Sequence, residues 1–108
     1  MAYGSSSLGF VYPKPASGLT GERLTVSSSP VQFANASTWQ SGGLVRTVDV
    51  DIQSNDVWAT FDGGTPSSSN GHRLYAGQNY TWSIERARAA RFVRVSADAT
   101  IQASPSTY

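Results

Sequence analysis

Residues 44–52, Leu-Val-Arg-Thr-Val-Asp-Val-Asp-Ile, contain the clearest strand pattern in the chain. Val48, Val50 and Ile52 point to one side of an extended backbone, and the threonine and the aspartates between them point to the other side. A period of two with apolar residues on one side is typical of a half-buried β-strand. This segment therefore predicts a sheet with one face in the core and one face in water.

Similar short runs, rich in β-branched and aromatic residues, recur between turn sequences along the chain. They lie at 24–26, 31–33, 57–61, 72–75, 78–84, 90–96 and 100–103. We expect 57–61 to form a hairpin with the strand at 44–52, and 90–96 to form a second hairpin with 100–103. Short strands at regular spacing predict an all-β fold, a small antiparallel β-sandwich or jelly-roll-like domain.

The segment 83–91 is ambiguous, because it combines good helix formers with a serine that can cap a helix. Its apolar residues do not recur at the spacing of a helix that packs on a core. We therefore expect a connection that leads into the strand at Phe92, with a single helical turn as the alternative.

The 108 residues divide into an extended N-terminal arm at 1–21, a β-sandwich domain at 22–104 and a polar C-terminal tail at 105–108. A flexible Gly-Ser run opens the arm, and Pro13-Lys14-Pro15 makes it stiff near its end. The apolar residues 8–12 between them either form an edge strand of the core or anchor the arm on a neighbouring subunit.

The composition excludes several classes of protein. The net charge of +1 predicts no general affinity for nucleic acid or for anionic membranes, and no apolar run reaches the length of a membrane span. The absence of cysteine excludes disulfides, thiolate metal sites and a cysteine nucleophile. Because the N-terminus lacks the features of a signal peptide, we expect synthesis in a cytoplasm.

No catalytic, cofactor-binding or metal-binding pattern is present in the sequence. His72 is the one histidine, and no Gly-x-Ser-x-Gly motif accompanies it. Asp49 and Asp51 fit the solvent side of a strand, and the run at 62–64 lacks the alternating oxygen ligands of a calcium loop. We therefore expect a protein that binds or assembles, and not an enzyme.

Two groups of side chains are candidates for an interface, because arginines and exposed aromatic residues carry much of the energy of protein contacts. The four arginines between 86 and 94 form either a solvated strand face or a docking patch for an acidic surface, with nucleic-acid binding as a third reading that the net charge disfavours. Trp58 has the opposite parity to Val57 and should face outward, and Trp39 lies in an expected loop at 35–43. The candidate interface residues are Phe10, Tyr12, Pro13, Pro15, Trp39, Trp58, Arg86, Arg88 and Arg91.

Several segments together resemble small virion structural proteins of tailed bacteriophages. The segments are Thr-Phe-Asp-Gly-Gly-Thr-Pro at 60–66, Gly-His-Arg-Leu at 71–74, Ala-Gly at 76–77, Arg-Ala-Ala-Arg-Phe-Val-Arg at 88–94 and Ala-Asp-Ala-Thr at 97–100. The resemblance covers residues 44–103 and consists of turn residues and core strands. It implies a small β-sandwich of the capsid decoration (cement) type or of the head and tail accessory type, and it supplies no catalytic residues.

The expectation that follows is a capsid decoration protein on the outer surface of a phage head, where it would bind the major capsid protein. Self-association is expected too, as a trimer in preference to a dimer. We expect no cofactor and no nucleic-acid or membrane partner. The alternative is a carbohydrate-binding module or a tail or fibre adhesin, in which Trp39, Trp58 and nearby tyrosines would contact glycans.

Overall fold

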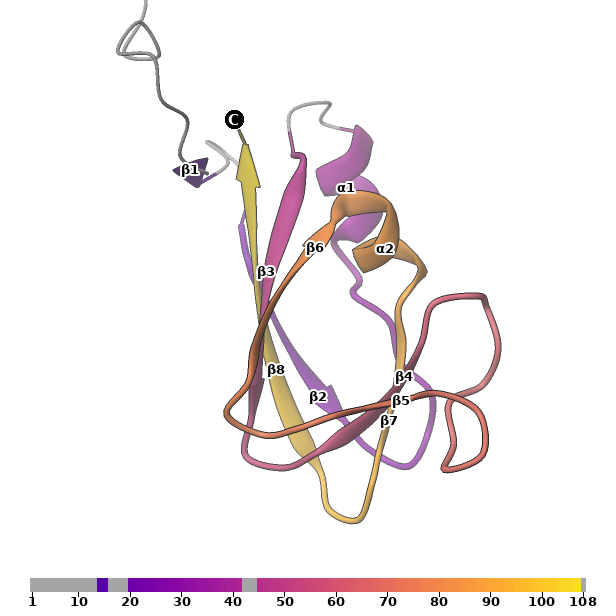
Figure 1. Cartoon of the computed structure of the whole chain (residues 1–108). Helices are drawn as coiled ribbons and strands as arrows, with labels where there is room; N and C mark the ends of the chain where they lie inside the picture. Colours follow the sequence, from indigo (N-terminus) through magenta and orange to yellow (C-terminus); the bar gives the residue numbers. More distant parts are fainter. Residues whose placement is uncertain (1–13, 16–19, 42–44, 108) are drawn as a thin grey trace, which may run out of the picture.

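The computed structural model of the chain describes residues 14–15, 20–41 and 45–107, which contain eight strands and two short helices (Figure 1). The strands are β1 (Lys14–Pro15), β2 (Glu22–Val26), β3 (Thr47–Gln53), β4 (Val57–Thr60), β5 (His72–Leu74), β6 (Asn79–Ser83), β7 (Arg91–Arg94) and β8 (Ala99–Thr107). The helices are α1 (Ala36–Ser41) and α2 (Ile84–Ala89).

The strands form two antiparallel sheets that pack together as a small β-sandwich, which confirms the predicted fold class. In the large sheet, β8 pairs with β3 along one edge and with β2 and β1 along the other, and β3 also pairs with β6. The small sheet has the order β5-β4-β7. Figure 1 shows α1 and α2 side by side at one end of the sandwich.

The alternation at 44–52 has the predicted consequence in β3. Val48, Val50 and Ile52 have exposed fractions of 0%, while Asp49 and Asp51 lie half-buried on the opposite face. Since β6 and β8 occupy both edges of β3, this strand lies in the interior of the large sheet.

Both expected hairpins are wrong, because the two strands of each expected pair lie in opposite sheets. β4 pairs with β5 and β7 and not with β3, and β7 pairs with β4 and not with β8. The edges of β3 are already taken, and Ser54, with a φ of 70°, turns the chain away toward the small sheet. Crossing in this way lets each strand bury its apolar face against the other sheet.

A helix replaces the connection expected at 83–91. The Ser83 hydroxyl caps α2 by accepting a hydrogen bond of 3.2 Å from the Arg86 amide. The buried face of α2 consists of Ile84 and Ala87, one turn apart. Because alanine is small and only weakly apolar, Ala87 does not mark a buried position in the apolar pattern, and this helix face could not be predicted from the sequence.

Trp39 is a core residue, and the expectation that it lies in a loop is wrong. It belongs to α1 and has an exposed fraction of 1%. The centroid of its ring lies 6.0 Å from that of Phe33, and its Nε1 donates a hydrogen bond of 2.9 Å to the Thr20 carbonyl. Trp39 is therefore not available to a binding partner.

The two ends of the chain differ from the expected boundaries where they are described. Residues 105–107, expected in a polar tail, belong to β8, and Pro105 and Ser106 are buried. Most of the expected arm at 1–21 lies outside the described residues. Its Lys14–Pro15 pairs with β8 opposite Thr107 and Ser106. The sandwich therefore uses backbone from both predicted extensions.

Trp39→Ala should lower the free energy of unfolding by about 3–5 kcal/mol, because it empties a buried indole site and removes the hydrogen bond to Thr20. Urea denaturation followed by far-UV circular dichroism measures this change. Trp58→Ala, at a half-buried position, is the control and should cost clearly less. Equal losses in the two variants would contradict the assignment of Trp39 to the core.

Candidate functional site

The outer face of the small sheet carries a group of side chains that we call the outer platform: Trp58, Arg73, Tyr75 and Val93. Trp58 lies in the middle strand, between Arg73 on β5 and Val93 on β7 in the strand register. Val57 and Ala59, its neighbours in β4, are buried in the core. Trp58 is half-buried on the opposite face, as its parity predicts.

Arg73 is held between two aromatic rings of the outer platform. Its guanidinium carbon lies 5.7 Å from the centroid of the Trp58 ring and 5.4 Å from that of the Tyr75 ring. Its Nε and Nη2 donate hydrogen bonds of 3.1 and 2.8 Å to Oδ2 of Asp56. The cation–π contacts and the carboxylate thus act on the same guanidinium group.

Asp56 joins the outer platform to the neighbouring turn. Its Oδ1 accepts a hydrogen bond of 2.8 Å from the Ala76 amide. This backbone donor and the guanidinium of Arg73 hold the pKa of the Asp56 carboxyl below its ordinary value. The carboxylate therefore stays charged under ordinary conditions and keeps Arg73 in place.

The outer platform has the composition of an interface anchor. Tyr75 has an exposed fraction of 54%, although it is a large aromatic residue. Trp, Tyr and Arg are the side chains that most often dominate protein–protein binding energy. Because Arg73 is already ordered by its neighbours, a partner that docks here loses little free energy in fixing it.

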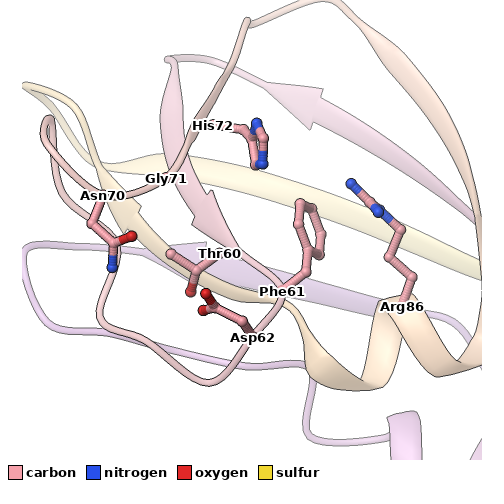
Figure 2. A pocket seen from close by; sticks show the side chains of 7 residues that line it. All are labelled: Thr60, Phe61, Asp62, Asn70, Gly71, His72 and Arg86. Atoms are coloured by element: carbon pink, nitrogen blue, oxygen red, sulfur yellow. The ribbon is translucent and has the colours of Figure 1, made fainter.

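A second feature lies beside α2, and we call it the edge hollow (Figure 2). It has a volume of about 340 Å³ and is lined by Thr60, Phe61, Asp62, Asn70, Gly71, His72 and Arg86. Two groups lie near the Phe61 ring. The Arg86 guanidinium carbon is 3.8 Å from the Phe61 ring centroid, and the centroid of the His72 ring is 5.9 Å from that same centroid. Behind these groups, Trp82 packs edge-on against Phe61 at 5.0 Å.

The loop between β4 and β5 forms one wall of the edge hollow, and hydrogen bonds within it hold its shape. Asp62 Oδ1 accepts a bond of 2.9 Å from the Gly64 amide, and Asn70 Nδ2 donates one of 3.2 Å to the Thr65 carbonyl. Gly71 has a φ of +148°, and a Cβ there would lie 2.9 Å from the Ala59 carbonyl oxygen. Gly71 thus allows the end of the loop to lie close against β4.

The predicted arginines do not form one strand face. Arg86 lines the edge hollow, Arg88 donates a hydrogen bond to Gln40 on α1, and Arg91 donates one of 3.0 Å to the Gly63 carbonyl. Arg86 and Arg91 therefore both contact the segment 61–63, while Arg88 ties the two helices together.

The remaining predicted residues belong to the arm. Phe10, Tyr12 and Pro13 lie outside the described residues, and the backbone of Pro15 pairs with Ser106. Sequence reasoning missed Arg73, Tyr75 and Phe61. The pairing of β4 with β5 would have revealed Arg73, because this register places it beside Trp58.

Within the part of the chain that the structure describes, no three His, Cys, Asp or Glu residues lie together in a group able to hold a metal ion. No helix in those ranges has the length and apolar character needed to cross a membrane.

Comparison with models of protein families, with curated proteins and with solved structures found no match.

Asp56→Asn should destabilise the fold at neutral pH, because it removes the negative charge that pairs with Arg73. The Asp56 pKa is lower in the folded chain than its ordinary value of 3.8, so this stabilisation is complete above 3.8 and is lost as the pH falls through the lowered value. The thermal midpoints of the wild type and the variant should therefore differ at neutral pH and converge in strong acid. A constant difference at all pH values would contradict this role.

Gly71→Ala should lower the free energy of unfolding by about 3 kcal/mol, because the new Cβ adds a clash with the Ala59 carbonyl to an unfavourable φ. Gly63→Ala is the matched control, with a φ of +87° and nothing within 4 Å of the added carbon. It should cost about 1 kcal/mol. Urea denaturation of the two variants measures the difference, and equal costs would show that the loop moves away from β4 without penalty.

Proposed function

We propose that the protein is a structural protein of a tailed bacteriophage virion and acts as a capsid decoration protein without enzymatic activity. It would be made in the host cytoplasm and would bind the major capsid protein on the outer surface of the head. The observation that carries the proposal is the outer platform, where the half-buried Trp58, the exposed Tyr75 and an immobilised Arg73 lie together on the outer side of the small sheet. The resemblance of residues 44–103 to small virion proteins supports the choice of partner.

Repetition of the contact over the capsid surface would strengthen the binding. A capsid presents many identical sites, so a modest contact at each copy gains strength when the bound copies also contact one another. We propose that the copies associate as a trimer, with the arm residues Phe10, Tyr12 and Pro13 reaching a neighbouring subunit. No cofactor, nucleic acid or membrane has a part in this mechanism.

Carbohydrate binding through the predicted tryptophans is a weaker alternative. Trp39 is buried and cannot reach a glycan. Trp58 is half-buried on the outer face, and the guanidinium of Arg73 lies over its ring and over that of Tyr75. An extended glycan would need both aromatic faces as a continuous flat strip, and Arg73 lies over both of them. These contacts favour a protein partner at the outer platform.

The test uses particles of the phage that encodes the chain, with the gene deleted and the purified protein added back. We expect the wild-type protein to bind the particles, and cryo-electron microscopy to show its density on the outer shell at two-fold or three-fold positions. Trp58→Ala combined with Arg73→Ala should weaken binding by at least about tenfold, since such anchors are each worth roughly 1–2 kcal/mol or more. Co-sedimentation with the particles measures the binding.

Thr25→Ala is the control, because Thr25 is exposed on β2 of the large sheet, away from the outer platform. This variant should bind like the wild type. Density confined to the tail or a fibre would contradict the decoration role. Unchanged binding by the Trp58 and Arg73 double variant would contradict the assignment of the docking surface.

A further inference from the structure

We propose that the edge hollow is a binding site for a neutral sugar ring, separate from the outer platform and independent of the function proposed above. The hollow lies at the open edge of the sandwich, between the ends of the β4–β5 loop and α2 (Figure 2). Its volume of about 340 Å³ is at the lower end of the range of small-molecule sites. One or two saccharide rings fit a space of this size.

The charges around the hollow select against most other ligands. Arg86 supplies a positive charge on one side of Phe61, and Asp62 supplies a negative charge on the other side. Within the described ranges, neither side chain belongs to an ion pair. A simple anion or cation therefore meets attraction from one of these charges and repulsion from the other, and an apolar ligand would desolvate both charges without compensation.

A polyhydroxylated ring meets these requirements, because every hydroxyl both donates and accepts hydrogen bonds. Oδ1 of Asp62 accepts from the Gly64 amide, which leaves Oδ2 to accept from a ligand hydroxyl. The amide of Asn70 uses its Nδ2 on the Thr65 carbonyl, which leaves its Oδ1 as a second acceptor. Arg86 and His72 supply the donors on the opposite side of the hollow.

Arg86 covers one face of the Phe61 ring, and the part of Phe61 that it leaves open to the hollow provides apolar surface for the C–H groups of such a ring. The Phe61 side chain is half-buried, and Trp82 supports it from the core at 5.0 Å. The guanidinium of Arg86 is stacked on it at 3.8 Å, so the donors of Arg86 stay next to the aromatic ring. The hydrogen bonds of the β4–β5 loop hold the opposite wall, and the site is thus formed before a ligand arrives.

The test is a titration of the ¹⁵N-labelled full chain with glucose, galactose, mannose and N-acetylglucosamine, each up to about 50 mM, since a site this open should bind a single ring with a Kd in the millimolar range. We expect at least one sugar to shift the backbone amide signals of Gly71, His72 and Arg86. The signals of Trp58 and Arg73 on the outer platform should not move. Acetate and methylammonium serve as the anionic and cationic probes.

Asp62→Asn should weaken the binding of the sugar at least about tenfold, since a hydrogen bond to a charged acceptor is replaced by one to a neutral amide. The new side chain still has an oxygen that can accept from the Gly64 amide, and the variant's own spectrum reports whether the loop is intact. Arg88→Gln, on the same helix but directed to Gln40, should bind the sugar like the wild type.

Three outcomes would overturn the proposal. The first is the absence of any shift with all four sugars. The second is a shift of the same amide signals by acetate that becomes stronger in Asp62→Asn, because this result identifies an anion site. The third is a sugar response at Trp58 and Arg73 instead, which places glycan binding on the outer platform. None of these results depends on whether the protein binds a capsid.

Discussion

The packing of Phe92 between the two sheets is the contact on which the rest of the structure depends. Phe92 is fully buried in β7, its ring stacks on Trp82 of the large sheet at 6.2 Å, and it meets Phe33 edge-on at 5.2 Å. Its backbone exchanges hydrogen bonds of 3.0 and 2.9 Å with Val31. One residue thus joins both sheets to the segment that leads into α1. Because Trp82 also supports Phe61, this contact extends from the core to the edge hollow.

Parity along a strand could be predicted from the sequence, whereas the pairing of strands could not. The alternation at 48–52 depends only on neighbouring residues, and the outward position of Trp58 follows from the same rule. Whether β4 joins β3 depends on β6 and β8, which are distant in sequence and occupy both edges of β3. The helix that buries Trp39 has six residues, too few to show a helical period. The edge hollow combines residues 60–62, 70–72 and 86, which are separated in sequence, so no local sequence pattern could predict it.

The β4–β5 pair places two different surfaces back to back. Trp58 and Arg73 are opposite each other in the register and face outward, while Ala59 and His72 form the next pair on the other side. Arg73 and His72 are adjacent in the chain, yet one belongs to the outer platform and the other to the edge hollow. This arrangement follows from the period of two in a strand. It lets a three-residue strand contribute to two sites without any side chain serving both.

Asp56 explains why the outer platform is rigid although it lies on short strands. Its side chain holds Arg73 and the Ala76 amide, and its carbonyl accepts a hydrogen bond of 3.2 Å from the Val95 amide. The residue just before β4 is thereby tied to β5, to the turn after it and to the end of β7. The same carboxylate neutralises the charge of Arg73, so the outer platform has little net charge. Attraction to a partner must then come from aromatic and apolar contact at short range, which favours a close-fitting protein surface over a diffuse acidic one.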